Sequence, residues 1–394
     1  MRRVAITGAG TVNPLALTVA GTYAALSEGR SAIGPLSFRD VDRLTVRIGA
    51  QIKDWTPDLT RADLAMMDLF SQYAVVAARQ AVAQSGLSFD TGLAESTGVI
   101  IGSAGGGLQT ADDNYRAVYQ EGKSRVHPFV VPRLMLNAAS AQVALDHGLL
   151  GPVYAVSTAC SSSNHAVGQA FHLIRSGGVD VMLAGGADAM LCFGGIKAWE
   201  GLRVLSETGC RPFSSDRDGM VMGEGAAVFV LENWDHACTR GAEIMAEIVG
   251  FAMTSDAVDM VQPSTQGAAR AIRLALRDGG MAAAEVGYIN AHGTGTTAND
   301  RCEAQAIAEV FDAPLVSSTK SAHGHLMGAA GAVELLACLL ALRQGVIAPT
   351  LGFVPGDCTL DVVPNEARQA RVTAALSNSF AFGGLNAVLA LRSV

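Results

Sequence analysis

Short apolar runs alternate with longer alanine-rich stretches along the whole chain, and this alternation predicts an α/β protein. The apolar runs have the length of buried strands, and the stretches between them repeat their apolar positions at helical spacing. Such an order is typical of mostly parallel sheets covered by helices. The predicted strands are Val4 to Thr7, Gly98 to Ile101, Tyr154 to Ser157, Val181 to Ala184, Ala226 to Leu231, Val286 to Asn290, Leu315 to Ser318 and Ala387 to Leu391. The predicted helices are Leu69 to Ser85, Ser161 to Ser176, Thr265 to Asp278, Cys302 to Phe311 and Ala329 to Arg343.

Parts of this pattern occur twice. The strand end at residues 156–158, followed by a helix of small residues, is echoed at residues 316–319. Residues 99–105 resemble residues 288–293 in the same way. One duplicated fold explains both echoes, and so does the general recurrence of strand, glycine turn and helix in α/β proteins. The two halves would meet near residue 240, with a long insertion at 108–150 in the first.

Composition narrows the class of protein. The chain has 394 residues, of which 49% are hydrophobic and 16% charged, so it folds around a large core. A net charge of −8 argues against nucleic acid or an anionic membrane as the main partner. An anionic partner would therefore need a local basic patch. Seven scattered cysteines, without a C-x-x-C pair, predict a reducing cytoplasm and neither a disulfide framework nor a zinc site.

Neither the N-terminus nor any internal segment predicts passage into or through a membrane. Arg2 and Arg3 precede an apolar run, as in a signal peptide, but Asn13 and Pro14 interrupt that run. The segment is better interpreted as a first buried strand. The longest apolar helix candidate, Ala332 to Leu342, contains an acidic residue and is too short to span a bilayer.

Cys160 is the first candidate for chemistry. It follows the apolar strand Val-Tyr-Ala-Val and precedes Ser-Ser-Ser-Asn and a helix of small residues. A thiol on such a turn faces a helix N-terminus, whose N–H groups and dipole favour the thiolate. By position alone, an inert buried cysteine is an equally good interpretation.

Two histidines and a lysine in the second half are further candidates. His292 and His325 lie in glycine-rich loops after predicted strands, where α/β proteins place catalytic groups. Lys320 lies in the same loop as His325 in a chain that otherwise prefers arginine, which indicates a need for a compact ammonium group. A solvated surface lysine is the alternative interpretation. His165 and His323 are better interpreted as structural, because each lies beside a better-placed candidate.

These residues occur within an ordered series of motifs. VSTACSSSNHAVG, NAHGTGT, SSTKSAHGHLMGAAGAVE and SNSFAFGG follow VAITGAG, MDLFSQYAVVAARQA and RDGMVMGEGAAVFVLE. The series resembles the elongating β-ketoacyl-[acyl-carrier-protein] synthases of the thiolase superfamily from Arg3 to Leu391. The resemblance implies a duplicated five-layered αβαβα fold. Residues 1–240 would hold the nucleophile and a dimer and acyl-pocket insertion, and residues 241–394 the two catalytic histidines.

The resemblance also implies a role for each residue. Cys160 would take an acyl group from a carrier-protein thioester, with the backbone N–H groups of Cys160 and Phe382 as an oxyanion hole. His292 and His325 would stabilise the enolate formed when malonyl-carrier protein loses its carboxylate. Lys320, paired with Glu334, would orient His325, since a buried ammonium group needs an anion. The product would be a β-ketoacyl group two carbons longer.

Other positions would bind the substrates. The resemblance assigns Thr294 and Thr296 to the phosphopantetheine arm of the carrier, and Phe380 and Phe382 to a gate. It places Gly105 at the base of the acyl pocket and Trp199 among the substrate-binding residues. Lys123, Arg125 and Arg203 match carrier-binding positions and would supply the basic patch. The enzyme itself would hold no cofactor and no metal. It would act in the cytoplasm as a homodimer, or as a heterodimer with a chain-length-factor-like subunit.

Two positions depart from the family pattern, and several activities stay open. Ala381 replaces a gate glycine, which puts the mobility of the gate in doubt. Gly105 replaces a bulky aliphatic residue of some relatives, which predicts more room for the acyl chain. The alternatives are a ketosynthase subunit of an aryl-polyene, nodulation-type or type II polyketide pathway, a CoA thiolase, and a scaffold subunit that binds carrier without turnover. A thiolase would use a second catalytic cysteine, which Cys338 or Cys358 would have to supply.

Overall fold

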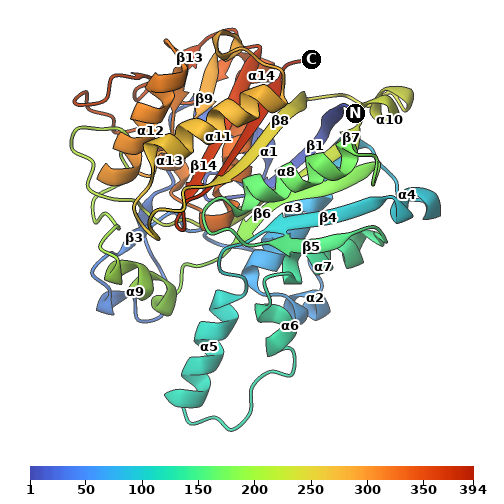
Figure 1. Cartoon of the computed structure of the whole chain (residues 1–394). Coiled ribbons are helices and arrows are strands. Elements are labelled where there is room, and N and C mark those ends of the chain that lie inside the picture. The colour runs from blue at the N-terminus through green and yellow to red at the C-terminus, as the bar shows by residue number, and fades with distance from the viewer.

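Eleven strands form one continuous mixed sheet in the computed structural model, which describes residues 1–394 (Figure 1). Their order is β12-β10-β9-β14-β15-β8-β1-β7-β6-β4-β5. The strands of the first half are β1 (Val4–Val12), β4 (Thr97–Gly102), β5 (Val153–Val156), β6 (Val181–Asp188) and β7 (Gly225–Asn233). Those of the second half are β8 (Ala246–Ser255), β9 (Tyr288–Asn290), β10 (Leu315–Ser317), β12 (Asp361–Val362), β14 (Ala374–Ala381) and β15 (Leu385–Arg392).

The strand order repeats, as the predicted duplication requires. The first half contributes five strands, β1, β4, β5, β6 and β7, and the second half contributes β8, β9, β10, β14 and β15, beside which β12 is added at the edge. If each set is numbered one to five along the chain, its strands lie side by side in the order 3-2-4-5-1 in both halves. The first strands of the two sets pair antiparallel, with Val4 opposite Ile248, and so join the two sets. The division near residue 240 falls in the connection between β7 and β8 and stays a prediction.

The prediction of mostly parallel sheets is only half right. The pairs β4–β5, β4–β6, β9–β10, β9–β14 and β10–β12 are parallel. The pairs β1–β7, β1–β8, β6–β7, β8–β15 and β14–β15 are antiparallel. Parallel neighbours need a crossover, which helices supply between the second, third and fourth strands of each set. The fifth strand follows the fourth without such a helix crossover, so it runs back beside it.

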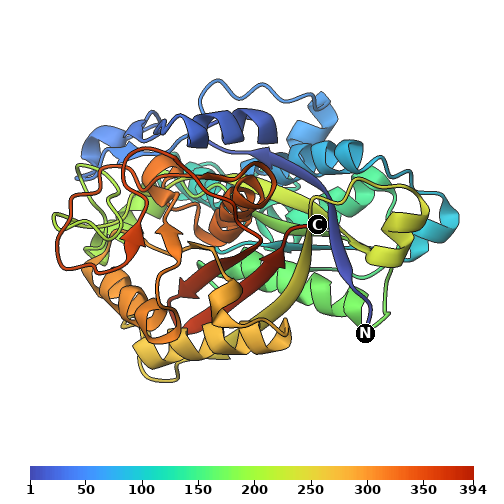
Figure 2. The ribbon, with the colours of Figure 1, turned by 90° about the horizontal axis from the view of Figure 1, so that it is seen from above.

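Helices complete five layers in the order α–β–α–β–α, which the view from above also shows (Figure 2). One outer layer packs on the first set of strands and contains α3 (Leu69–Ser85) and α7 (Ala138–His147). The other packs on the second set and contains α11 (Thr265–Asp278) and α12 (Thr297–Val310). Between the two sets lie α8 (Ser162–Arg175) and α14 (Ala330–Gln344). The fold is therefore the predicted thiolase-like one.

The composition of β1 and α14 explains their places. All nine residues of β1 are buried, which confirms the strand interpretation of the N-terminus. A Cβ atom on Gly10 would lie 1.9 Å from the backbone oxygen of Ala77, so glycine lets α3 pack directly on β1. In α14, every residue from Ala330 to Leu342 is buried, as expected for a helix that is apolar on all sides. The segment Met327–Gln344 has the length and apolarity of a membrane span, but 83% of it is buried inside the protein.

An arm projects from the body of the protein at the start of the predicted insertion (Figure 1). It consists of α5 (Leu108–Tyr119), the loop after it and α6 (Val130–Leu134). The smaller elements are α1 (Val19–Ser27), α2 (Arg61–Met66), α4 (Thr91–Glu95), α9 (Phe193–Gly201), α10 (Trp234–Thr239), α13 (Lys320–His323), the pair β2 (Gly34–Pro35) and β3 (Ile48–Gly49), and the pair β11 (Val346–Ile347) and β13 (Arg368–Gln369).

Most predicted elements are confirmed within a few residues. Two of the predicted elements differ by five residues: β1 ends at Val12 rather than Thr7, and α12 begins at Thr297 rather than Cys302. The sequence analysis does not predict the long strands β8 and β14, or several of the helices, among them α1, α5, α7 and α9.

Candidate active site

Cys160 lies on a sharp turn between β5 and α8. The preceding residue, Ala159, has a φ of 51°, in the left-handed region that residues with a side chain rarely adopt. The hydroxyl of Ser162 accepts a hydrogen bond from the backbone N–H of Thr158 at 2.9 Å and so closes the turn. The end of β4 abuts it, because a Cβ atom on Gly102 would lie 2.3 Å from the carbonyl carbon of Ser162. The turn is thus held on both sides, and Cys160 is buried within it.

Burial decides the protonation state of Cys160. It raises the pKa of the thiol to about 12, and the nearby ammonium group of Lys320 opposes this shift only in part. The sequence analysis expects the helix N-terminus to favour a thiolate. The structure differs, because the loss of solvent around the sulfur outweighs the favourable charge. The resting side chain is a neutral thiol.

His325 is fixed in one tautomer. The backbone N–H of Met327 donates to its Nδ1 at 3.1 Å, so Nδ1 carries no proton and Nε2 does. Nε2 has no hydrogen-bond partner in the protein. It lies at the end of the side chain, which lines the same cavity as Cys160. Burial and Lys320 hold the pKa of His325 well below its ordinary value, so the ring is neutral. It is a hydrogen-bond donor aimed into the cavity.

His292 has the same tautomer for a different reason. Its Nδ1 lies 3.3 Å from Nζ of Lys320, and an ammonium group can only donate, so Nδ1 accepts and Nε2 carries the proton. Burial and the charge of Lys320 hold the pKa of His292 well below its ordinary value. The two imidazole rings lie edge to face, with 5.4 Å between their centroids. The site therefore has two adjacent neutral rings, each with a proton on Nε2.

Lys320 is confirmed as a buried residue rather than a solvated one. Its side chain and that of Glu334 are fully buried and form an ion pair. Its Nζ also donates to the backbone oxygen of His292 at 2.6 Å. Lys320 therefore holds His292 directly, by both its ring and its backbone, whereas the resemblance assigned it to His325. Burial raises the pKa of Glu334, against the pull of the adjacent ammonium group.

Two acidic residues of α12 hold the second-half loop and were not singled out from the sequence. Glu303 accepts hydrogen bonds from the backbone N–H groups of His292 and Gly293, each at 2.8 Å. Asp300, one helical turn earlier on the same face, accepts from the N–H of Thr294 at 3.0 Å. Burial raises the pKa of Glu303 to about 7 and raises that of Asp300. In the sequence, only the three-residue spacing of the two acids in Ala-Asn-Asp-Arg-Cys-Glu could have indicated this role. That spacing can be interpreted only when the loop is known to pack against the helix.

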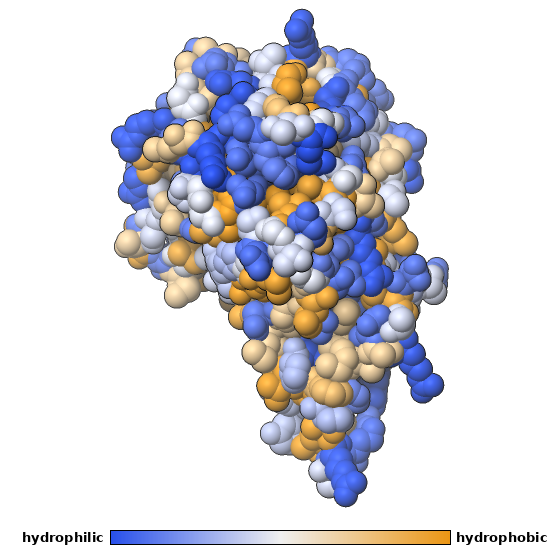
Figure 3. Space-filling model, turned by 90° about the vertical axis from the view of Figure 1, so that its right-hand side faces the viewer, coloured by the Kyte–Doolittle hydropathy of each residue, from blue (hydrophilic) through white to orange (hydrophobic).

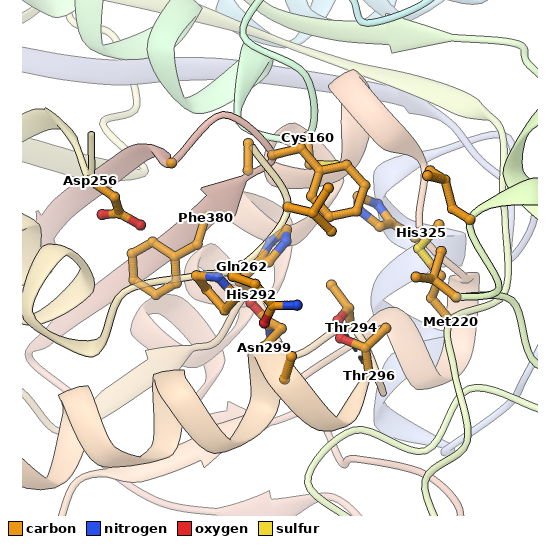
Figure 4. A pocket seen from close by; sticks show the side chains of 18 of the residues that line it. Cys160, Met220, Asp256, Gln262, His292, Thr294, Thr296, Asn299, His325 and Phe380 are labelled. Carbon is orange, nitrogen blue, oxygen red and sulfur yellow. Dashed lines mark hydrogen bonds between the residues drawn. The ribbon is translucent and has the colours of Figure 1, made fainter. Parts of the chain in front are cut away.

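One cavity of about 240 Å³ joins these groups. Figure 4 shows Cys160 on one side of the imidazole rings and the two threonines on the other. The hydroxyls of Thr294 and Thr296 lie 2.8 Å apart. The ring of Phe382 stacks on Trp199 with centroids 5.8 Å apart. The predicted site residues that line the cavity are Cys160, Trp199, His292, Thr294, Thr296, His325, Phe380 and Phe382.

The local backbone explains why alanine is tolerated at position 381, where the family pattern has a gate glycine. Ala381 is the last residue of β14 and pairs with Leu385, so it has extended backbone that alanine adopts readily. The turn between β14 and β15 is made by Gly383 and Gly384, whose φ values are 83° and 67°. Glycine is needed at those two positions and not at 381.

The space predicted above Gly105 is filled. A Cβ atom on Gly105 would lie 2.7 Å from both Cγ and Sδ of Met190. Met190 thus occupies the space that the glycine leaves, and the prediction of more room for the acyl chain stays a prediction.

Lys123, Arg125 and Arg203 are exposed but do not form one patch on the single chain. Lys123 and Arg125 lie on the loop that ends the arm, and Lys123 is paired with Glu121 at 2.8 Å. Arg203 follows α9, between Leu202 and Val204, which line the cavity. Figure 1 shows the end of the arm well separated from α9.

The histidines interpreted as structural have protein partners. Both ring nitrogens of His323 lie within hydrogen-bond distance of a protein oxygen, at 2.8 and 3.0 Å, and burial lowers its pKa to about 3. His165 lies 3.0 Å from the hydroxyl of Thr158, against the Cys160 turn. Neither lines the cavity.

Comparison with known proteins covers the whole chain. Residues 1–237 match the family "Beta-ketoacyl synthase, N-terminal domain", and residues 245–354 match "Beta-ketoacyl synthase, C-terminal domain". Nodulation protein E of Rhizobium sp. (strain N33) is 48% identical over the full length of both chains. 3-Oxoacyl-[acyl-carrier-protein] synthase 2 of Staphylococcus aureus (strain COL) is 39% identical over 99% of this chain and 98% of its own. The solved ishigamide ketosynthase/chain length factor superposes with a TM-score of 0.94 at 37% identity, covering 100% of this chain and 99% of its own.

Proposed function

The chain belongs to the β-ketoacyl synthase family and is a ketosynthase, and we propose that it joins an acyl group held on Cys160 to a malonyl group on an acyl carrier protein. One observation carries the proposal. The rings of His292 and His325 lie edge to face and line the same cavity as Cys160, and each ring is fixed by a contact at Nδ1. Two convergent neutral donors are what an enolate oxygen needs when a malonyl thioester loses its carboxylate.

The first half-reaction moves the acyl group to the cysteine. The sulfur of Cys160 attacks the carbonyl carbon of the acyl thioester, and the negative oxygen of the tetrahedral intermediate is held by the backbone N–H groups of Cys160 and Phe382. The intermediate collapses with loss of the pantetheine thiol. The proton of the Cys160 thiol leaves with that thiol, so the site ends without a net change in charge. This balance suits a buried cysteine whose resting form is neutral.

The second half-reaction forms the new carbon–carbon bond. The malonyl thioester loses CO₂, and the electron pair of the broken bond becomes an enolate, whose oxygen accepts from His292 and His325. The enolate carbon attacks the acyl carbonyl on Cys160, and the Cys160 sulfur leaves as a thiolate, which takes one proton from water. The product is a β-ketoacyl group two carbons longer. Thr294 and Thr296 line the opposite side of the cavity and would bind the pantetheine arm.

The thiolase alternative lacks its second base. Among the residues that line the cavity, Cys160 is the only cysteine. The sulfur of Cys338 points to the backbone oxygen of Leu376 within α14's contact with β14, and Cys358 lines a separate cavity near α12. Neither is placed to remove a proton from an acetyl group bound beside Cys160.

The test is a two-substrate reaction followed by intact-protein mass spectrometry. We expect acyl-carrier protein alone to add one acyl group to the enzyme, and added malonyl-carrier protein to remove it with formation of a β-ketoacyl-carrier product. Cys160→Ala should abolish both events. Cys302→Ala, which removes a buried thiol on α12 outside the cavity, should change neither. An adduct that survives Cys160→Ala would refute the proposed nucleophile, and release without a β-keto product would refute the condensation.

We also infer that the chain acts as a dimer through the free edge of β5. This strand ends the eleven-stranded sheet, and its outer edge is unpaired. Exposed apolar side chains surround it, among them Leu145, Leu150 and Tyr154, and they continue onto the arm with Tyr119 and Val131. Figure 3 shows apolar residues gathered on the arm. An open strand edge with apolar neighbours is a surface that a partner covers.

Light scattering of the purified chain tests this inference. A mass of two chains supports a homodimer. The solved ketosynthase named above is paired with a chain length factor, and a heterodimer of that kind would leave the chain monomeric until such a subunit is added. Leu145→Lys should weaken the dimer. A monomer that binds neither itself nor a related subunit would refute the inference.

Carrier docking follows from the dimer. The end of the arm carries Lys123 and Arg125, and Arg203 is an exposed residue between Leu202 and Val204, which line the cavity. We propose that Arg203 contacts the acidic carrier where the pantetheine arm enters, and that Lys123 and Arg125 add to the contact. Arg203→Glu should raise the KM for carrier substrates and leave the rate with a pantetheine thioester lacking the carrier unchanged.

A further inference from the structure

Asp188 is a buried carboxylate that the reaction described above does not use. It is the last residue of β6 and is fully buried. Its Oδ1 accepts hydrogen bonds from the hydroxyl of Ser103 at 2.7 Å and from the backbone N–H of Gly105 at 3.0 Å. Its Oδ2 accepts from the backbone N–H groups of Ala104 at 2.9 Å and Gly328 at 2.6 Å. Both oxygens are thus bonded, and none of the four donors is a basic side chain.

These hydrogen bonds keep Asp188 charged at neutral pH. Burial raises the pKa of its carboxyl to about 6, and the four hydrogen bonds limit that rise. A buried charge is costly unless hydrogen bonds replace the water that it has lost. Hydrogen bonds to an ionised group are also stronger than those between neutral groups. The carboxylate therefore holds the backbone segments that donate to it.

The four donors to this carboxylate come from both halves of the protein. Three of them, in residues 103–105, directly follow β4, the strand whose end abuts the Cys160 turn. Gly328 lies in the second half, three residues after His325. The two segments are in direct contact, since a Cβ atom on Gly328 would lie 2.5 Å from the backbone nitrogen of Ala104. The carboxylate therefore joins the segment next to the nucleophile to the segment that follows His325.

The segment after His325 needs such a hold because its backbone is strained. Met327 has a φ of 50°, in the left-handed region that residues with a side chain rarely adopt. Its backbone N–H donates to Nδ1 of His325 and so fixes the orientation and the tautomer of the ring. A strained residue keeps its conformation only where the surrounding structure holds it. The hydrogen bond from Gly328 to Asp188, one residue further on, supplies that hold.

We propose that Asp188 is a positioning residue for the condensation step, which orients His325 by fixing the Met327–Gly328 backbone against the loop after β4. The proposal rests on the function proposed above and deepens it. Asp188 does not line the cavity, so it acts on the reaction only through the backbone that holds the His325 ring. Its loss should slow condensation, which uses the His325 donor, and spare the loading of Cys160.

The test compares Asp188→Asn with the natural chain in single-turnover reactions followed by intact-protein mass spectrometry. The amide keeps the size of the side chain but turns an N–H₂ group toward donors that need an acceptor. We expect condensation of preloaded acyl-enzyme with saturating malonyl-carrier protein to slow about 10²-fold, as a small misplacement at a reacting group does. Loading should stay within about twofold. Asp188 raises the pKa of the Cys160 thiol, so removal of its charge gives no reason for slower loading.

Combination with His325→Ala separates a positioning role from a merely structural one. If Asp188 acts through the His325 ring, Asp188→Asn should slow condensation less than about twofold in a His325→Ala enzyme, because residues that act as a unit are not additive. A general loosening of the site would slow that enzyme by the same factor as the natural chain. Ser103→Ala removes one donor and keeps the carboxylate, so it should give a smaller loss in the same step without depending on the folding of the Asp188 variant.

Glu232→Gln is the matched control. Glu232 is also a fully buried carboxylate, and it accepts hydrogen bonds from the hydroxyl of Thr7 and from Arg240, both at 2.8 Å. It pairs with Val181, at the opposite end of β6 from Asp188. Glu232→Gln should lower the melting temperature and leave both steps unchanged.

The outcomes separate the two proposals. If the natural chain takes no acyl group, or forms no β-keto product with malonyl-carrier protein, the proposed function fails and this inference fails with it. If the natural chain completes both steps but Asp188→Asn and Ser103→Ala keep its condensation rate, only this inference is overturned. An equal loss from Asp188→Asn in the His325→Ala enzyme, or from Glu232→Gln in the natural chain, would also overturn it.

Discussion

The two halves of the protein place different chemistry at equivalent points of one fold. The loop after the second strand carries Gly105 in the first half and His292 in the second. The loop after the third strand carries Cys160 in the first half and Lys320 with His325 in the second. The first-half loops are neutral and border a methionine-rich cluster, whereas the second-half loops contain a buried ion pair. Under the proposed function, one half would hold the acyl group, and the other would stabilise the charge that develops during condensation.

The difference teaches that duplication separates two requirements that conflict within one loop. An acyl chain needs apolar and adaptable surroundings, and an enolate needs rigid donors. The rigidity of the second half comes from acids on α12, which hold the loop by its backbone, and from Lys320, which holds the ring of His292. The first half has one such anchor, Asp188, which holds the backbone of the loop after β4.

Removing one partner of the buried ion pair should have the largest effect on stability. Lys320→Met leaves the carboxylate of Glu334 buried without its cation, so we expect the free energy of unfolding to fall by about 3–5 kcal/mol. The measurement is urea unfolding monitored by circular dichroism. Lys320→Met combined with Glu334→Leu should recover much of the loss. If the double variant is as unstable as the single one, the pair is not the source of the effect.

Loss of the His325 hydrogen-bond donor should slow condensation without slowing the loading of Cys160. His325→Ala should lower the condensation rate about 10²–10³-fold, the usual effect of removing one hydrogen bond to a developing oxyanion. The acyl adduct on Cys160 should still form at close to the natural rate. Single-turnover mass spectrometry with and without malonyl-carrier protein measures both steps. Equal losses in both steps would contradict the division of labour between the halves.

The second half should also show a pH dependence that arises from Glu303. Its pKa is raised from 4.5 to about 7 by burial, so the folded state keeps this proton to higher pH than the unfolded state does. The contribution of this group to stability is therefore present below about pH 4.5 and is lost as pH rises to about 7. We expect the natural chain to lose about 3 kcal/mol relative to Glu303→Gln over that range. Parallel unfolding curves at each pH check this, and a constant difference would contradict it.

The smallest effects should come from the caps of two equivalent outer helices. Ser264 caps α11 by accepting from the N–H of Gly267 at 3.2 Å, and Ser264→Ala should cost about 1 kcal/mol. Asp68 caps α3 and also accepts from the N–H of Thr110, at the base of the arm, at 2.8 Å. Asp68→Ala should therefore cost more, about 2 kcal/mol or above. Melting temperatures of the two variants decide the order.

Strand-end motifs made most of the site predictable. Cys160, His292 and His325 each follow a strand, and the equivalent ends of these strands meet at one cavity. The hydrogen bonds that fix the His292 loop were less predictable, because their acceptors, Glu303 and Asp300, lie on a helix whose packing against the loop is not evident from the sequence. The same limit explains Met190, whose relation to Gly105 exists only once β4 and β6 are neighbours.

Burial depth accounts for the remaining differences. The helix position of Cys160 favours a thiolate, but the sequence does not state how little solvent reaches the sulfur. The strand β8 was not predicted because Gly250 and scattered polar residues weaken its apolar pattern. Its pairing with β1 on one side and β15 on the other stabilises it instead. Pairing with neighbouring strands thus determines strand formation where the local sequence preference for a strand is weak.

The pairing of β1 with β7 and β8 delays the folding of β1 during synthesis. β1 is synthesised before its partners β7 and β8, which begin at Gly225 and Ala246. At about 5–20 residues per second, the first strand waits roughly ten to fifty seconds for them. During that time an apolar strand of nine residues has two open edges. Expression at reduced translation speed lengthens this exposure, so chaperone supply rather than slow growth is the sound way to raise the yield of folded protein.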